Sequence, residues 1–179
     1  LVCAGLVTRG DVRVTGVDTS LLESTLDKLR ETGAELEVEP CAVRASAPRA
    51  LEGVRAVTAP FPGFPTDMQA QLLAALTVAS GDSVVTERVF ENRFMHVPEL
   101  RRMGADIALS DRTAHVRGVA RLSGAPVMAT DLRASAGLIV AALAAEGDTV
   151  VNRVYHIDRG YERIEEKLRS LGAEIRREG

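Results

Sequence analysis

The sequence contains no tryptophan, two tyrosines and four phenylalanines, so aromatic residues make up only 3% of its 179 residues. Proteins with a general nucleic-acid surface use stacking rings and a basic excess, whereas this chain has a formal net charge of -3. Its longest apolar run, AGLIVAALAA from Ala136, is too short to span a bilayer. We therefore expect neither nucleic acid nor a membrane as a partner.

Cysteine is equally scarce. Cys3 and Cys41 are the only two, and their spacing is not that of a metal site, which favours a reducing, cytoplasmic location. We expect Cys3 in a helix core and Cys41 in a strand. The sequence has no glycine-rich phosphate loop or Walker lysine, and we predict no metal and no cofactor. The histidines fall in different elements, where each is expected to be satisfied individually: His96, His115 and His156.

What the sequence does have is an internal repeat. VTRGDVRVTGV, VASGDSVVTERV and AAEGDTVVNRV are three versions of one pattern, a helix end, a glycine and a strand. Each precedes a segment that ends in a Gly-Ala phrase, and the glycines of these phrases, Gly33, Gly104 and Gly172, are 71 and 68 residues apart. We predict one incomplete domain over residues 1–179, made of units at approximately 1–58, 59–122 and 123–179.

Each unit predicts the same local structures. A β-branched strand follows the first glycine, and an amphipathic helix comes next, with a capping-box pattern at Ser20 and Glu23 in the first unit. The Gly-Ala phrase then ends this helix and starts a short strand, and another strand follows in CAVRAS and TAHVRG. The helical periodicity of the second and third units comes from Phe94, Val97, Leu100 and Met103, and from Tyr161, Ile164, Leu168 and Leu171.

A second kind of helix connects the units and is apolar nearly all round. Two such helices open at Thr66 and Thr130, and LVCAGLV resembles the tail of a third. Helices without a polar face are buried, so the fold class predicted is α/β, a pseudo-three-fold domain of three βαβαββ-like units around buried central helices. The first unit lacks its opening strand and the third its last, so we expect a portion of a longer protein.

Two aspartates stand at the openings of these helices. Asp67 and Asp131 each follow a threonine that is expected to be the N-cap. An aspartate in this place stabilises any helix through the dipole and the free N–H groups, and this structural explanation stays open for either residue alone. The repeat makes the helices parallel, so both N-termini should emerge on one face, which would attract anions.

Arginines are predicted at the same end. Lys28 and Lys167 are the only lysines among 22 basic residues, so a single arginine carries little information here. Three arginines at strand exits or helix entries are more informative: Arg93, Arg133 and Arg159. Guanidinium groups bind carboxylate and phosphate bidentately, which favours a small, multiply anionic ligand.

Four ordered segments, PTDMQAQ, VFENRFMHVPEL, MATDLRASA and YHIDRGYERIEEKLRSLGA, resemble those of UDP-N-acetylglucosamine enolpyruvyl transferases (1-carboxyvinyltransferases). The resemblance runs from about Leu1 to Arg177. It implies two similar domains, each a pseudo-three-fold inside-out α/β barrel; this chain would be most of the C-terminal one, without the other. It further implies a cytoplasmic bacterial enzyme that transfers the enolpyruvyl group of phosphoenolpyruvate to the 3-hydroxyl of UDP-N-acetylglucosamine and releases phosphate. That reaction is the first committed step of peptidoglycan synthesis.

The resemblance also implies roles for single residues. Asp67 would contact the sugar 3-hydroxyl as its base, Val89 would contact UDP-N-acetylglucosamine through its backbone, and Arg159 would bind phosphoenolpyruvate. Three more would line the cleft and organise its closure: Arg93, Asp131 and Arg133. The catalytic set is then Asp67, Asp131 and Arg159. The family's loop nucleophile and its lysine-asparagine pair would lie in the other domain, so we expect this portion alone to be inactive.

Three alternatives remain open on the sequence. One is an enolpyruvyl transferase that acts on another nucleotide in secondary metabolism, and another is a non-catalytic homologue that binds UDP-sugars. The third, a repeat protein used only as an interaction scaffold, is disfavoured by the charged cluster at one end. EPSP synthase shares the architecture but is not expected to carry VFENRFMHVPEL. The pKa of Asp67 is also undecided, because desolvation raises it whereas a helix N-terminus and arginines lower it.

Overall fold

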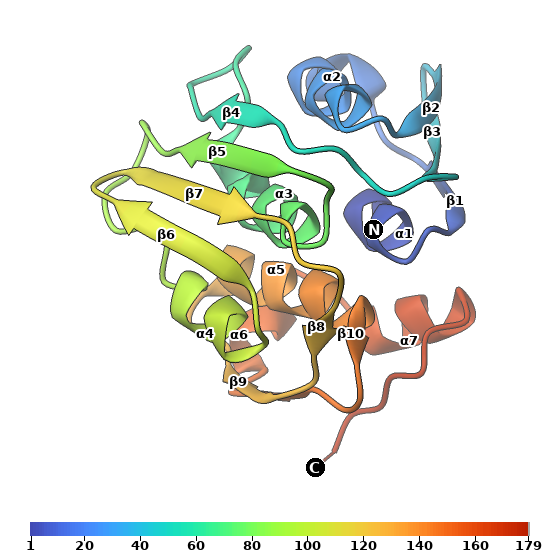
Figure 1. Ribbon diagram of the computed structural model, residues 1–179. Helices are drawn as coiled ribbons and strands as arrows, with labels where there is room; N and C mark the ends of the chain where they lie inside the picture. Colours follow the sequence, from blue (N-terminus) through green and yellow to red (C-terminus); the bar gives the residue numbers. More distant parts are fainter. Residues whose placement is uncertain (179) are drawn as a thin grey trace.

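Three apolar helices form the centre of the computed structural model, which describes residues 1–178 (Figure 1). They are α1 (Val2–Val7), α3 (Gln69–Leu76) and α5 (Leu132–Leu143), and each contacts the other two. All eight residues of α3 are buried. A helix with no polar face is stable in water only when neighbours cover it on all sides, and the predicted buried centre is confirmed.

Helices α3 and α5 approach each other closely at Gly137. A Cβ atom at this position would lie 2.8 Å from the carbonyl oxygen of Ala70, well inside normal contact distance. Only glycine fits without a shift of one helix, because its missing side chain lets backbone meet backbone. This close packing fixes the relative position of the two helix openings that carry Asp67 and Asp131.

Strands surround the central helices in three groups. The first is an antiparallel sheet in the order β1-β3-β2, made of β1 (Asp11–Thr15), β2 (Glu35–Glu39) and β3 (Ala42–Ser46). The second has the order β4-β5-β7-β6, with β4 (Arg55–Val57), β5 (Asp82–Thr86), β6 (Asp106–Ser110) and β7 (Thr113–Arg117). The third consists of two parallel pairs, β8 (Leu122–Ser123) with β10 (Ala145–Glu146) and β9 (Pro126–Met128) with β11 (Val150–Asn152). The parallel pair β4-β5 has its counterpart in β9-β11, so the backbone shows the repeat.

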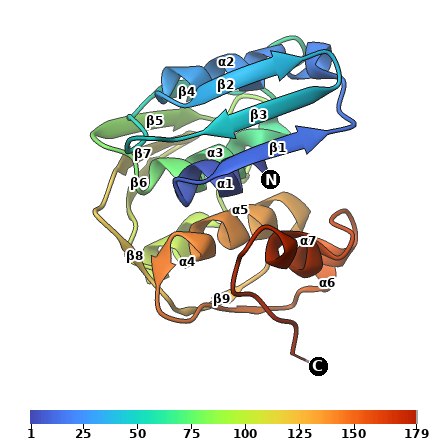
Figure 2. The ribbon, with the colours of Figure 1, turned by 90° about the vertical axis from the view of Figure 1, so that its right-hand side faces the viewer.

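Amphipathic helices lie outside the centre. The first unit has a 3-10 turn, η1 (Thr19–Leu22), that leads into α2 (Glu23–Glu31), and the second has α4 (Val97–Arg102). The third has two short helices, α6 (Tyr155–Asp158) and α7 (Ile164–Ser170). Figure 2 shows β1, β3 and β2 side by side as one layer, with α5 and α7 in the lower half of the molecule.

The glycines of the three Gly-Ala phrases have the same backbone conformation. Gly33, Gly104 and Gly172 have φ values of 81°, 91° and 96°, in the left-handed region that other residues avoid. Each follows the last turn of an outer helix, as a helix-ending glycine does. The three-fold repeat predicted from the sequence is therefore present in the backbone.

Three local predictions were wrong. The Ser20–Glu23 capping box does not form, because the Asp18 carboxylate accepts the Ser20 backbone N–H and a 3-10 turn precedes α2. Cys41 is exposed in the turn between β2 and β3, although Cys3 is buried in α1 as predicted. Residues 174–178 form no strand, because no ladder partner reaches them within residues 1–178.

Candidate active site

The Asp67 carboxylate lies at the opening of α3 and binds two arginines. It belongs to a 3-10 turn, η2 (Thr66–Met68), that leads directly into α3. Nη2 of Arg93 donates to Oδ1 at 2.9 Å, and Nη2 of Arg133 donates to Oδ2 at 2.8 Å. The Asp67 side chain is 52% exposed, so the carboxylate is held by two cations and still faces solvent. The structure thus brings Asp67, Arg93 and Arg133 together at the opening of α3.

Asp131 has a different role, which is to cap a helix. Its Oδ1 accepts the backbone N–H groups of Arg133 and Ala134 at 2.8 and 2.9 Å, so Asp131 itself is the N-cap of α5. The prediction that the preceding threonines are the N-caps was wrong, since the Thr66 hydroxyl donates to Glu87 instead of accepting a helix N–H. Capping by Asp131 fixes the first turn of α5, and with it the direction of Arg133.

The two arginines determine the direction in which the pKa of Asp67 is shifted. The hydrogen bond from Arg133 lowers the pKa, the charges of Arg133 and Arg93 lower it further, and partial burial opposes them without prevailing. The carboxyl pKa therefore lies below its usual value. The same hydrogen bond, together with Tyr161, raises the pKa of Arg133 above its usual value. Asp67 is an anion at neutral pH, held in place by its two cations.

Tyr161 and Gln71 were not recognised as part of this site from the sequence. Tyr161 fitted the apolar periodicity of the third unit, but it precedes α7, which begins at Ile164. Its hydroxyl accepts a hydrogen bond from Nε2 of Gln71 at 3.1 Å, so it links α3 to the neighbourhood of Arg133. A tyrosine or glutamine that makes such a link has no distinct local pattern.

Arg159 lies beside the cluster without joining it. It is the exposed C-cap residue of α6, and within residues 1–178 its guanidinium has no hydrogen bond or ion pair. The next residue, Gly160, packs against Leu132, since a Cβ there would lie 3.0 Å from both Leu132 methyl groups. The Arg159 turn therefore contacts the first residue of α5, at the same end of the molecule as Asp67 and Arg133.

Val89 is half-buried in the loop that follows β5. Its backbone N–H donates to Oε1 of Glu87 at 2.8 Å, and the next amide, of Phe90, donates to the same oxygen at 3.1 Å. Arg93 comes from the same loop, and its guanidinium lies 4.9 Å from the centre of the Phe90 ring. The loop therefore brings Val89, Phe90 and Arg93 to one site. Glu87, which accepts both amides, was not among the residues predicted from the sequence.

Comparison with known proteins identifies the family. Residues 1–168 match the EPSP synthase (3-phosphoshikimate 1-carboxyvinyltransferase) family. The chain belongs to the EPSP synthase family.

Curated relatives in this EPSP synthase family carry the name suggested by the four sequence segments. The UDP-N-acetylglucosamine 1-carboxyvinyltransferase of Sphingopyxis alaskensis is 58% identical over 175 residues, which cover 98% of this chain and 41% of that protein. The enzyme of the same name from Zymomonas mobilis is 58% identical over 177 residues, which cover 99% of this chain and 42% of that protein. The chain thus spans about two fifths of the length of the curated relatives it matches. The resemblance predicted from the sequence is confirmed.

Solved structures confirm the fold. The enolpyruvyl transferase NikO from Streptomyces tendae aligns with a TM-score of 0.88 and 33% identity, over 98% of this chain and 42% of that one. EPSP synthase from Acinetobacter baumannii aligns with a TM-score of 0.72 over 99% of this chain and 42% of that one. At 22% sequence identity, this match shows the fold alone. The predicted pseudo-three-fold inside-out α/β barrel of the enolpyruvyl transferase type is confirmed.

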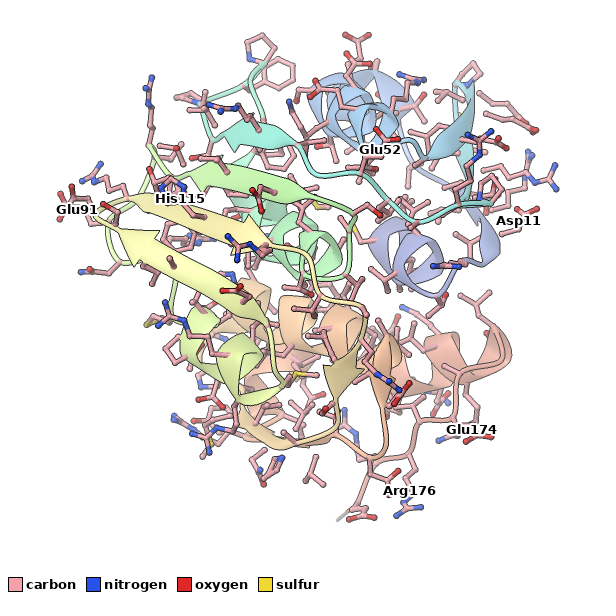
Figure 3. All side chains as sticks on the ribbon, viewed as in Figure 1. Asp11, Glu52, Glu91, His115, Glu174 and Arg176 are labelled. Atoms are coloured by element: carbon pink, nitrogen blue, oxygen red, sulfur yellow. The ribbon has the colours of Figure 1, made fainter. Side chains whose placement is uncertain are left out.

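The three histidines of this EPSP synthase family chain differ in environment. His115 is exposed on β7 (Figure 3), and His156 packs against the Tyr155 ring at 4.3 Å. His96 is fully buried, and neither of its ring nitrogens has a hydrogen-bond partner within residues 1–178, so the expectation that each histidine is satisfied was wrong. Burial lowers the pKa of His96 to about 4 against the opposing charge of Asp131, which keeps the ring neutral at pH 7.

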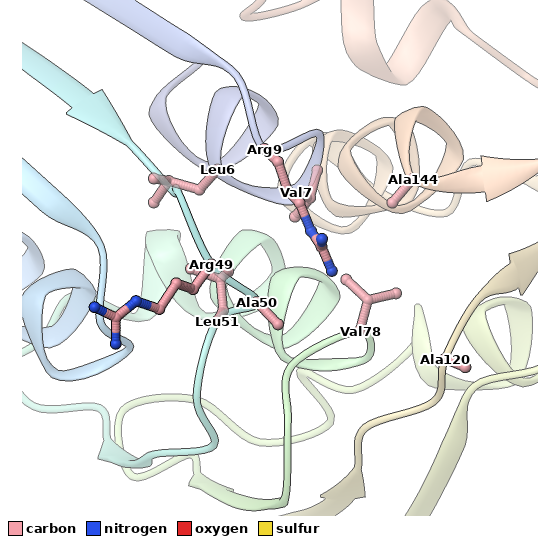
Figure 4. Close-up of a pocket in the computed structure, with 9 residues that line it drawn as sticks. All are labelled: Leu6, Val7, Arg9, Arg49, Ala50, Leu51, Val78, Ala120 and Ala144. Carbon is pink, nitrogen blue, oxygen red and sulfur yellow. The ribbon is translucent and has the colours of Figure 1, made fainter.

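Other candidate sites are weaker. Over residues 1–178, no group of three or more histidine, cysteine, aspartate or glutamate side chains is arranged to hold a metal ion. A cavity of about 120 Å³ lies at the opposite end of the central helices, next to Val7, Val78 and Ala144, with Arg49 pointing away from it (Figure 4). A larger hollow of about 550 Å³ lies between the loop after β5 and the β6-β7 turn and includes Arg93. In the described part of the chain, the helices are too short or too polar to cross a membrane.

Proposed function

We propose that this chain is part of a UDP-N-acetylglucosamine 1-carboxyvinyltransferase. That enzyme transfers the enolpyruvyl group of phosphoenolpyruvate to the 3-hydroxyl of UDP-N-acetylglucosamine and releases phosphate, the first committed step of peptidoglycan synthesis. The observation that carries the proposal is the Asp67 carboxylate held between Arg93 and Arg133. It stands in a chain that is 55–58% identical to enzymes of that name.

Asp67 is the proposed base. In the described state its two arginines lower the pKa of its carboxyl, which makes it a weak proton acceptor. Phosphoenolpyruvate carries a carboxylate and a phosphate, the anions that guanidinium groups bind best. When these anions bind Arg93 and Arg133, the hold on Asp67 weakens and its pKa rises. Binding of the anionic substrate would thus prepare the base for the sugar hydroxyl.

The reaction then needs three proton transfers, one C–O bond formed at C2 and one C–O bond broken there. The 3-hydroxyl gives its proton to Asp67 as its oxygen attacks C2 of phosphoenolpyruvate, and a proton is added at C3. The tetrahedral intermediate next loses phosphate from C2 and a proton from C3, which restores the double bond. The intermediate carries carboxylate and phosphate together, so preorganised arginines stabilise it by electrostatics.

The other residues have supporting roles in this proposal. Arg159, exposed beside the opening of α5, binds phosphoenolpyruvate. Asp131 serves the reaction by capping α5 and thereby aiming Arg133. The Val89 N–H is already bound to Glu87, so a backbone contact with UDP-N-acetylglucosamine would use the Val89 carbonyl as the acceptor of a substrate N–H or O–H.

The proposed partner of this domain is a second domain of the same enzyme. The chain spans about two fifths of the length of its curated relatives, and catalytic groups beyond Asp67 and the arginines are expected in the remainder. Closure of the two domains over the substrates would exclude water and strengthen the arginine contacts. A cytoplasmic location is part of the proposal, since the substrates are cytoplasmic metabolites and both cysteines are free.

The test is an assay of the full-length product of the gene that encodes residues 1–179. The protein is mixed with phosphoenolpyruvate and UDP-N-acetylglucosamine, and released phosphate is measured together with the mass of the sugar nucleotide product. Phosphate release with a matching enolpyruvyl adduct supports the proposal. A folded protein that binds neither substrate, or that releases no phosphate, overturns it.

A second candidate is an enolpyruvyl transferase that uses a different nucleotide acceptor. The enolpyruvyl transferase NikO shares this fold with a TM-score of 0.88 at only 33% identity, well below the identity to the UDP-N-acetylglucosamine enzymes, so the fold by itself does not determine the acceptor. A panel of nucleotides, UDP-sugars and shikimate 3-phosphate in the same assay separates the candidates. The highest kcat/KM identifies the acceptor.

A further inference from the structure

Among the described residues 1–178, a buried carboxylate next to the proposed site has no cation as its partner. Glu87 follows the last residue of β5 and is only 1% exposed. Its Oε1 accepts hydrogen bonds from the Thr58 hydroxyl at 2.7 Å and from the Val89 and Phe90 amides at 2.8 and 3.1 Å. Its Oε2 accepts from the Thr66 hydroxyl at 2.9 Å. Within residues 1–178, all four donors to Glu87 are neutral.

These donors belong to three separate chain segments. Thr58 follows β4, Thr66 begins the turn that carries Asp67, and Val89 and Phe90 form the loop that carries Arg93. Thr58 strengthens the junction, because its hydroxyl oxygen also accepts the Arg88 amide at 2.9 Å. The Glu87 backbone is fixed in turn by its N–H, which donates to the Arg112 carbonyl at 2.8 Å. One carboxylate therefore joins the segment of the proposed base to the loop of the proposed sugar contact.

A carboxylate buried without a cation is unfavourable unless hydrogen bonds replace its hydration. Burial raises the pKa of Glu87, but the hydrogen bonds from Thr58, Phe90, Val89 and Thr66 outweigh burial and leave the pKa below its usual value. The group is thus an anion whose acceptor positions are directed at these donors. An apolar side chain could fill the same space, but it could not orient two backbone amides and two hydroxyls at once.

We propose that Glu87 is a positioning residue, which holds Asp67 through Thr66, and Val89 through its amide, in a fixed relation to each other. This inference rests on the proposed function, because it supposes that Asp67 and Val89 contact the same sugar nucleotide. Glu87 itself touches no substrate. Its effect is to keep the base and the sugar contact at a fixed distance and orientation. Misplacement of a reacting group by about 1 Å can lower turnover on the order of 10²-fold.

The test compares Glu87→Gln with Thr66→Val in the full-length protein. Glutamine keeps the size of the side chain, but its amide group cannot accept at both former oxygen positions. We expect Glu87→Gln to lower kcat on the order of 10²-fold and to raise KM for the sugar nucleotide about tenfold, with KM for phosphoenolpyruvate nearly unchanged. Thr66→Val should lower kcat and leave both KM values unchanged. Thr66→Ser, which keeps the hydroxyl, should restore kcat. Glu91→Gln is the matched control, because Glu91 lies in the same loop with a side chain that is 79% exposed.

A merely structural role would reduce the amount of active protein, which lowers the apparent kcat and leaves both KM values unchanged. Unchanged KM for the sugar nucleotide in folded Glu87→Gln therefore overturns the proposal. Amide hydrogen exchange gives a readout independent of turnover: the amides of residues 88–90 should exchange faster in Glu87→Gln than in wild-type protein, but not in Glu91→Gln. Equal exchange overturns the positioning role even if the protein has another activity. Absence of phosphate release by the wild-type protein instead contradicts the proposed function.

Discussion

Arg133 donates a hydrogen bond from Nη2 to Oδ2 of Asp67 at 2.8 Å, although the two residues are 66 positions apart in the sequence. The pair joins the openings of two central helices, η2-α3 and α5, which pack backbone to backbone at Gly137. It also lowers the pKa of Asp67 and raises that of Arg133. The helix packing thus controls both the position and the ionisation of the proposed base.

Replacement of Asp67 should abolish most activity and leave the fold intact. Asp67→Ala removes the proposed base and is expected to lower kcat by about 10²–10⁴-fold, the usual contribution of a general base. The measurement is steady-state phosphate release by the full-length protein. Asp27→Ala is the control, since Asp27 is an exposed aspartate that pairs with Arg30 on α2. Near-normal turnover in Asp67→Ala would remove Asp67 from the role of base.

Loss of Arg133 should change both the rate and its pH dependence. Arg133→Gln removes one positioned donor, which is expected to lower kcat by about 10²–10³-fold. Because Arg133 lowers the pKa of Asp67, its loss raises that pKa. Asp67 must be ionised to act as base, so the acid limb of the pH profile of kcat/KM should move to higher pH.

The matched control for this variant is Arg121→Gln. Arg121 is an exposed arginine that pairs with Glu146, away from the opening of α3. Its profile should coincide with that of the wild-type protein. An acid limb that stays in place in Arg133→Gln, or moves to lower pH, would contradict the assignment of this limb to Asp67.

A side chain at Gly137 should destabilise the central helices. Gly137→Ala places a Cβ 2.8 Å from the Ala70 carbonyl oxygen, and overpacking of this kind lowers the free energy of unfolding by about 1–3 kcal/mol. The measurement is the urea midpoint of unfolding. Gly10→Ala is the control, because the nearest atoms to a Cβ there lie at 3.4 Å. Equal midpoints for the two variants would show that α3 and α5 can separate without loss of stability.

Residues 1–179 alone should have no turnover. The chain spans about two fifths of its curated relatives, and the proposed chemistry needs groups from the remainder. Purified residues 1–179 are mixed with both substrates, and phosphate release is compared with that of the full-length protein at equal concentration. Circular dichroism verifies that the portion is folded. Phosphate release by the portion alone would contradict a division of the active site between two domains.

The sequence by itself determined most of the elements and their three-fold arrangement, although it also predicted a strand over residues 174–178 that does not form. The glycines at 33, 104 and 172 and the apolar helices are local patterns, and local patterns fix backbone conformation and burial. Equivalent positions in repeated units lie at the same end of a symmetric domain. The repeat alone therefore predicts that Asp67, Arg93 and Arg133 lie together.

Only the tertiary structure decided what those residues do to one another. Tyr161 lies beside Arg133, and Glu87 joins three segments. These contacts connect residues far apart in the chain, so no local periodicity encodes them. The lowered pKa of Asp67 likewise results from a balance between hydrogen bonding and desolvation, and both depend on distances that exist only after the helices have packed.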